Sequence, residues 1–259
     1  MLYKMLFALI AISLPLLPLD TLQAKINSAG DAINQAGRQR MLTQRIVKAY
    51  ALTILGDNKD QHQKELQSAI KLFESQLADL QEFAPTDDVK RSIAKVQKFW
   101  PEMKAIVTAP PTRSKVEELR SVAEDTLSAS HDVVLALEDT YNSSAAQIVN
   151  LSGRQRMLSQ RMANLYMLKA LGFEKSRYKS DMRQAMSEFN GALKELRQFE
   201  RNTPEIRKSL MQVYTQFEVF KQSIKADNKE LIPNLIATAS SEILVKMNEL
   251  TGIYADMAH

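Results

Sequence analysis

The sequence contains no cysteine in its 259 residues. It therefore has no disulfide, no thiolate nucleophile, no cysteine-ligated metal and no cysteine for a lipoprotein anchor. Histidine is almost as rare, and His62, His131 and His259 lie far apart in the sequence, without the spacing of a metal site. We expect packing or surface roles for all three. No Ser-His-Asp set, carboxylate pair or glycine-rich phosphate loop stands out, so the sequence predicts neither an enzyme nor a bound cofactor or metal.

Glycine and proline are scarce, at 7 and 8 residues, while good helix formers fill most of the chain. An apolar share of 45% with 25% charged residues is typical of a folded protein. The net charge is only +4, and no aromatic residues alternate with the basic ones as they do in a nucleic-acid platform. The composition thus predicts an all-α protein that does not bind nucleic acid.

Long apolar runs are confined to the N-terminus. Lys4 precedes an apolar stretch from Met5 to Leu17, and a small residue, Ala24, follows at a suitable cleavage point. This pattern predicts a secretory signal peptide over residues 1–24, and an uncleaved membrane anchor is the alternative. Nothing later approaches 18 consecutive apolar residues, so we expect an exported protein whose mature part is soluble.

One nine-residue string occurs twice. Gly-Arg-Gln-Arg-Met-Leu-Thr-Gln-Arg at residues 37–45 returns at residues 153–161, an offset of 116, with only Thr43 replaced, by Ser159. The same offset relates Tyr50 to Tyr166. A core needs apolar residues of suitable size, but it does not need three arginines and two glutamines at fixed places. We therefore interpret the string as a binding element within an internal repeat.

Apolar spacing and turn residues divide each copy into four helical stretches. The first copy is expected to contain helices over about residues 26–55, 60–83 and 87–107, the last with a kink or break at Pro101, and a fourth that starts near residue 112. We find no strong breaker before Ser152-Gly153, so this fourth helix is expected to run on into the second copy. The second copy continues with helices to about residue 171, over 175–199, to 224 and over 231–257. The prediction is two tandem up-and-down four-helix bundles, over residues 25–148 and 149–259, with one long shared helix as an option.

The three arginines of the motif point in different directions on a helix. At about 100° per residue, Arg38 and Arg45 share a face, while Arg40 lies about 200° away. Residues 33–55 carry four cations and no acid, and residues 142–172 do the same. Because an unpaired buried charge costs several kcal/mol, an acid on another helix or a bound anion is expected to complete the site. Salt bridges to adjacent helices are the favoured interpretation for Arg38 and Arg45.

The motif resembles that of the PilJ-type sensor domain, which is found at the N-terminus of type IV pilus chemotaxis transducers. This domain is related to the periplasmic domain of nitrate and nitrite sensor kinases of the NarX/NarQ class. The resemblance covers both copies and implies periplasmic four-helix bundles. It also implies that the arginine directly before the methionine grips an anion from two symmetry-related helices, and the matching residues here are Arg40 and Arg156. Gly37 and Gly153 match the small residue that lets these helices approach.

The leading hypothesis is a stand-alone sensor that recognises a small anion such as nitrate or nitrite. Gln44 and Gln160, one turn beyond the arginines, are candidates for second contacts. No second membrane helix, HAMP linker or kinase precedes His259, so a membrane-bound sensor or transducer is expected as the partner. The alternative is a ligand-free helical interaction module, accessory to a pilus, an envelope complex or a sensor kinase. The two copies are expected either to form one pseudo-symmetric site within the chain or to pair across a homodimer.

Overall fold

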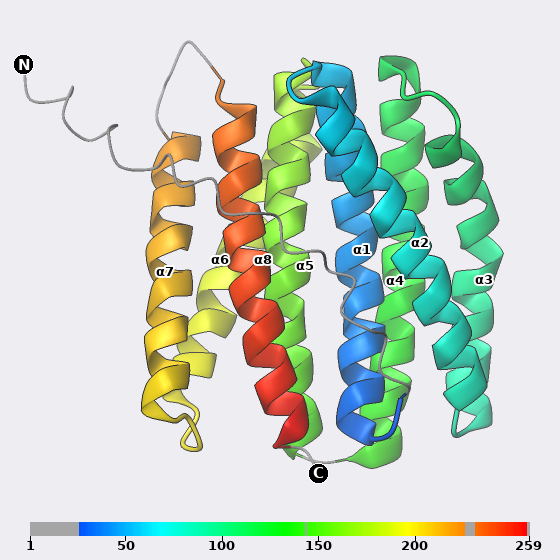
Figure 1. Cartoon of the computed structure of the whole chain (residues 1–259), viewed down its shortest axis with the longest axis vertical. Helices are drawn as coiled ribbons and strands as arrows, with labels where there is room; N and C mark the ends of the chain where they lie inside the picture. The colour runs from blue at the N-terminus through cyan, green and yellow to red at the C-terminus, as the bar shows by residue number, and fades with distance from the viewer. Residues whose placement is uncertain (1–25, 143, 226–230, 258–259) are drawn as a thin grey trace, which may run out of the picture.

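The computed structural model describes residues 26–142, 144–225 and 231–257, so the proposed signal peptide lies outside the described residues. Within these ranges the chain is entirely helical, and each copy supplies four long helices (Figure 1). The helices are α1 (Ala29–Leu55), α2 (Lys59–Phe83), α3 (Asp87–Thr108), α4 (Val116–Tyr141), α5 (Ser144–Ala170), α6 (Ser176–Gln198), α7 (Pro204–Lys225) and α8 (Pro233–Asp256), with a 3₁₀ turn η1 at Arg113–Lys115. The all-α prediction is confirmed, and most helix limits fall within a few residues of those expected.

The ends of the helices follow from local sequence. Ser28 caps α1 by accepting a hydrogen bond from the backbone N–H of Asp31, and Gly56 ends the helix in the left-handed region at φ 92°. Gly172 does the same after α5, at φ 82°. α3 continues through Pro101, so the break expected there is wrong. Pro101 lies on the exposed side of α3, where water can satisfy the carbonyl that proline leaves free.

The two copies are not joined by one long helix. α4 ends at Tyr141 because Asn142 adopts the left-handed conformation, at φ 38°, and its N–H donates to the carbonyl of Glu138 at 2.7 Å. Asparagine is one of the few residues that visit this region readily, and a search for glycine and proline alone overlooks it. Gly153 lies inside α5, and the boundary that we placed between residues 148 and 149 also falls within this helix.

The helices that carry the repeated motif lie side by side at the centre. α1 and α5 run parallel, and the remaining helices surround them (Figure 1). α1 packs against α2, α4, α5 and α8, so every residue from 39 to 53 is buried. The first copy of the motif is therefore buried except for the partly exposed Arg38, whereas Arg154 is exposed in the second copy. Most polar side chains of the motif must find partners inside the protein.

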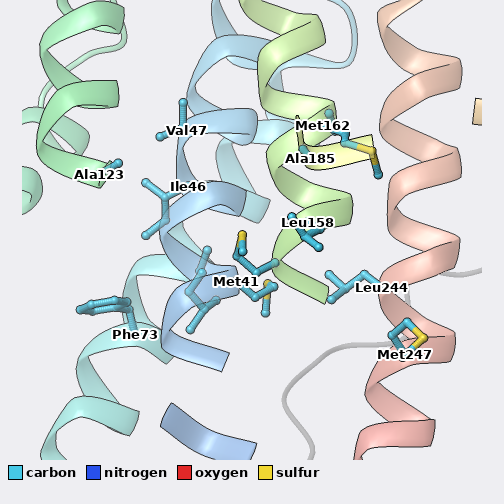
Figure 2. Packing of buried hydrophobic residues seen from close by; sticks show 14 of the residues in the cluster. Met41, Ile46, Val47, Phe73, Ala123, Leu158, Met162, Ala185, Leu244 and Met247 are labelled. Atoms are coloured by element: carbon cyan, nitrogen blue, oxygen red, sulfur yellow. The ribbon is translucent and has the colours of Figure 1, made fainter. Parts of the chain in front are cut away.

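One hydrophobic core runs through both copies. Figure 2 shows Met41, Phe73, Leu158 and Met247, which come from both repeats, in this single cluster. The tyrosine pair retains its symmetry, because the hydroxyl groups of Tyr50 and Tyr166 each accept a 3.0 Å hydrogen bond from the loop before the fourth helix of their own copy. Among the described residues, no helix is both long and apolar enough to cross a bilayer.

Candidate anion-binding site

Gly37 and Gly153 mark the place where the two central helices bring Arg40 and Arg156 together. A Cβ atom on Gly37 would lie 3.3 Å from Nη2 of Arg40 and 3.4 Å from Nη2 of Arg156. A Cβ atom on Gly153 would lie 3.1 Å from Nη2 of Arg156 and 3.8 Å from Nη2 of Arg40. The two guanidinium groups thus face the same small space, one from each copy. The site is formed within one chain and needs no homodimer.

Both guanidinium groups are bonded to neutral atoms. Arg40 Nη2 donates to Oδ1 of Asn150 at 2.6 Å, and its Nη1 lies 3.2 Å from Nδ1 of His131. Arg156 Nη1 donates to Oδ1 of Asn248 and Nη2 to the carbonyl of Asn34, both at 3.1 Å.

No carboxylate among the described residues forms an ion pair with either Arg40 or Arg156. The Nε atom of each arginine is buried without a hydrogen bond. Glu138, an acid whose charge acts on Arg40, accepts a hydrogen bond from Nδ2 of Asn150 at 2.8 Å. Arg40 and Arg156 are the two largest fully buried side chains among the described residues, and no carboxylate there is paired with their charge.

Burial and like charges act against both cations. Burial, followed by the charge of Arg154, lowers the pKa of Arg40 to about 10, although Glu138 raises it in part. Burial, followed by Arg38 and Arg40, holds the pKa of Arg156 well below its usual range. A guanidinium still keeps its proton at neutral pH. The interface of α1 and α5 therefore concentrates positive charge in a medium of low polarity, where an anion would be stabilised.

A family of known proteins matches the chain in two copies. The family, PilJ, is described as the type IV pili methyl-accepting chemotaxis transducer N-terminal domain, and it matches residues 22–126 and 140–242. The chain belongs to this family. Comparisons with curated proteins and with solved structures found no match. Each PilJ match contains one copy of the motif, so each contributes one arginine to the central pair.

The two glutamines lie one turn beyond the arginine pair, and Gln44 links the two PilJ copies through Asn164. Gln44 Nε2 lies 3.3 Å from Oε1 of Glu124, and its Oε1 accepts a 2.6 Å hydrogen bond from Asn164. Gln160 Nε2 donates to the carbonyl of Ser240 at 3.1 Å, and residue 240 corresponds to residue 124 at the repeat offset. Neither glutamine forms a hydrogen bond with Arg40 or Arg156 within the described part of the chain.

The other arginines of the PilJ motif divide in their pairing. Arg45 forms the predicted salt bridge, with Nε 2.9 Å from Oε1 of Glu65. For Arg38 the prediction is wrong, because no carboxylate pairs with it among the residues that the structure describes. Arg154, its counterpart, pairs with Glu188 at 2.8 Å, whereas the residue that corresponds to Glu188 in the first copy is Leu72.

A cavity of about 270 Å³ leads to the arginine pair from one side, between α4, α5 and α6. Arg40 and His131 line it together with Arg154 and Arg161, whose charges are offset by two acids, Glu124 and Glu188. Arg156 is not part of its lining. Access from this side therefore reaches Arg40 first.

The sequence analysis missed the neutral residues that hold the arginines. Asn34 and Asn150 correspond at the 116-residue offset, so extending the repeat comparison upstream of the motif finds them. His131 and Asn248 are not related by this offset, and only the packing of α4 and α8 on the central helices brings them to the site.

Proposed function

We propose that this chain is an exported sensor subunit that binds a small oxyanion of the nitrate or nitrite type between Arg40 and Arg156. The observation that carries the proposal is the meeting of two buried guanidinium groups whose hydrogen-bond partners, in the part of the chain that the structure describes, are all neutral. Burying an uncompensated charge is costly, so two such charges repeated at corresponding positions favour a binding role over a packing role. The sensory character of the PilJ family agrees with this interpretation.

The chemistry of the pair suits a small planar anion. A guanidinium presents a rigid fork of N–H donors that meets two oxygen atoms at once, and two forks facing each other form a clamp. Oδ1 of Asn150 and the carbonyl of Asn34 now accept the bonds that anion oxygens would take over. Gly37 and Gly153 keep the space beside both Nη2 atoms free of side chains. Binding would exchange neutral acceptors for a charged one, which strengthens each hydrogen bond.

The chain would report the presence of the bound anion to a membrane-bound transducer or sensor kinase. The PilJ family comprises the N-terminal domains of chemotaxis transducers, which are typically periplasmic. The apolar segment at residues 5–17 supports export. The anion would lie between α1 and α5, one helix from each copy. Binding would therefore change the spacing of these two helices, and the partner protein would detect this change.

Calorimetric titration of the chain lacking residues 1–24 with nitrate and nitrite tests the proposal. Chloride at equal ionic strength is the control for general salt effects. We expect a 1:1 complex and a rise in melting temperature, because a ligand at about 100 times its Kd stabilises the folded state by about 2.7 kcal/mol. Arg40→Ala and Arg156→Ala are each expected to abolish binding, while Arg207→Ala, which removes an exposed charge on α7, leaves it unchanged.

A ligand-free interaction module remains the second candidate, because both Nη atoms of each arginine already have protein partners. No heat and no thermal shift at millimolar nitrate and nitrite would exclude the anion proposal and favour this alternative. An affinity unchanged in Arg40→Ala and Arg156→Ala would instead move the anion site elsewhere.

A further inference from the structure

A second hollow lies between α5, α6 and α7 and has no lining residue in common with the cavity at Arg40. It encloses about 490 Å³, within the usual range for small-molecule sites. Its wall is mostly carbon, and the lining includes Leu165, Tyr166, Phe173, Met182, Met186 and Ile224. We call it the α6 groove. Methionine is flexible and polarisable, so two methionines suit a wall that adapts to an alkyl chain.

At the corresponding place in the first copy, the equivalent apolar side chains are buried. Leu66 and Ile70, which correspond to Met182 and Met186, are 0% and 8% exposed, whereas both methionines are only partly buried. The second helix therefore packs more closely on the central helix in the first copy than in the second. An apolar wall that one copy buries and the other leaves open is available to a ligand.

Three exposed cations surround the groove. Lys169, Lys179 and Arg183 line it, and none of them pairs with a carboxylate in the described part of the chain. A fourth lining cation, Lys175, is already paired with Glu117 at 2.6 Å. Glu174 is the single acid in the lining, so the rim is positively charged.

The first copy lacks these charges. The residues that correspond to Lys169, Lys179 and Arg183 are neutral, namely Thr53, Gln63 and Gln67. The open apolar wall and the basic rim therefore occur together in the second copy and are both absent from the first. Their joint occurrence indicates one ligand that has an apolar part and a negative charge.

We propose that the α6 groove binds an anionic amphiphile, a single alkyl chain with a carboxylate or similar head group. The chain packs against Met182, Met186 and Phe173, where each buried CH₂ group adds to the apolar part of the binding free energy. The head group lies at the rim, where Lys179 and Arg183 offer charge-assisted hydrogen bonds. The groove shares no lining residue with the arginine site, so its occupancy does not depend on the proposed anion function.

Titration of the chain lacking residues 1–24 with dodecanoate, below the concentration at which it forms micelles, tests this assignment. We expect 1:1 binding, with dodecanol at least tenfold weaker because it lacks the charge. The triple variant K169T/K179Q/R183Q gives the rim the residues of the first copy, and it is expected to weaken dodecanoate binding at least tenfold. The matched control K194Q/R207Q/K208Q removes three exposed cations from the opposite ends of α6 and α7 and is expected to change nothing.

A filling variant separates the groove from general surface attraction. Met186→Trp places a larger side chain in the groove and is expected to abolish dodecanoate binding while leaving nitrate titration and the melting temperature of the free protein largely unchanged. Equal affinity for dodecanoate and dodecanol, an equal loss in both triple variants, or full binding by Met186→Trp would each overturn the proposal. Flotation with phosphatidylglycerol vesicles identifies the source of the amphiphile. If Met186→Trp abolishes flotation, the groove captures lipid chains from the vesicles. If flotation survives in this variant, surface charge and not the groove binds the vesicles, and the proposal is overturned.

Discussion

Helix α1 buries positive charge in two ways within about two turns. Arg45 and Lys48 contact one carboxylate, Oε1 of Glu65, at 2.9 and 3.0 Å. Among the described residues, the guanidinium of Arg40 forms hydrogen bonds only with Asn150 and His131, and that of its counterpart Arg156 also bonds only neutral atoms. The first group is a buried ion cluster that binds α1 to α2, and the second is an arginine pair without a counterion.

The internal repeat shows which arrangement is conserved between the two copies of this chain. Lys48 corresponds to Asn164 and Glu65 to Asp181, which pairs instead with Arg120 at 2.5 Å. The ion cluster is therefore present in one copy only, whereas the arginine without a counterion is present in both. Packing can be solved in different ways in the two copies, but a clamp needs both of its halves. This difference favours a structural role for Glu65 and a ligand role for Arg40 and Arg156.

The largest expected effect comes from removing the acid of the ion cluster. Glu65→Gln leaves Arg45 and Lys48 buried without a carboxylate, and breaking a buried pair in this way costs about 3–5 kcal/mol. Urea denaturation at pH 7 measures the loss. The control Glu74→Gln breaks a more exposed pair with Lys104, and we expect it to cost less than about 1 kcal/mol.

The ion cluster also determines how the stability difference between wild type and Glu65→Gln depends on pH. Although burial opposes it, the charges of Lys48 and Arg45 hold the pKa of Glu65 well below its usual range. Its stabilisation is thus present above the pKa of the unfolded state, about 4.3, and is lost as the pH falls toward the lower pKa of the folded state. The gap between wild type and Glu65→Gln should be full at pH 7 and narrow below about pH 4. A gap that stays constant down to pH 3 would contradict the ion-cluster explanation.

Replacing the arginine pair should not destabilise the fold, in contrast to the loss of stability expected for Glu65→Gln. In Arg40→Met with Arg156→Met, two desolvated like charges are removed and apolar side chains fill their place. We expect the free energy of unfolding in nitrate-free buffer to stay equal or to rise by about 1–2 kcal/mol, since replacing buried charge by apolar residues is often stabilising. The same variant should lose all stabilisation by nitrate. A loss of more than about 3 kcal/mol would show that the pair holds the fold together as the ion cluster does.

Gly37 and Gly153, which lie beside the arginine pair on α1 and α5, allow the pair to be disturbed without removing a charge. An alanine at position 153 places Cβ 3.1 Å from Nη2 of Arg156, so the flexible end of the arginine must shift. We expect nitrate affinity to fall about tenfold, or about 1.4 kcal/mol, because the donors no longer converge. Calorimetry of Gly37→Ala and Gly153→Ala measures this change.

Gly191→Ala serves as the control for these glycine variants. Gly191 lies in α6 with nothing within 4 Å of its Cβ position, so this variant should be more stable by about 0.5–1 kcal/mol without any effect on affinity. Unchanged nitrate affinity in all three variants would show that the space beside Gly37 and Gly153 is not part of the nitrate site.

Sequence reasoning located most of the helices, but it did not find the break between α4 and α5, and it named the arginine pair on other grounds. Helix periods and glycine stops are local signals, so features such as Gly56 and Gly172 were predictable. The resemblance of the motif to the PilJ family named Arg40 and Arg156 as ligand-binding residues, and the helix projection added that Arg40 points away from Arg38 and Arg45. The arrangement of the copies was not predictable, because it depends on the left-handed conformation of Asn142, which the sequence permits but does not require. Nor was the position of His131, which depends on how α4 packs against α1.

The smallest expected effect concerns the one titratable partner of the arginine pair. His131 accepts from Arg40 only while its ring is neutral, and Asn248, which faces Arg156 instead, does not titrate. Burial, followed by the charges of Arg40 and Arg154, lowers the pKa of His131, although Asp132 raises it in part. Because the unfolded state takes up a proton first, wild-type stability should decline as the pH falls below about 6.5, and His131→Asn should remove this part of the decline.

A bound anion adds negative charge next to His131. The ring, which is favoured in its neutral form without the anion, is then favoured in its protonated form. The cavity in which this histidine lies also contains Arg161, Glu124 and Glu188, and their charges are present with or without the anion. An anion held by Arg40 takes over the hydrogen bond that the ring accepted and favours the imidazolium, so the pKa of His131 rises on binding. Nitrate affinity should therefore increase by a few-fold from pH 7.5 to 5.5, with proton uptake seen as a difference in heat between buffers of unlike ionisation enthalpy. His131→Asn makes the two halves of the clamp alike at this position and should bind nitrate with the same affinity at both pH values, whereas an unaltered pH dependence would assign the proton to another group.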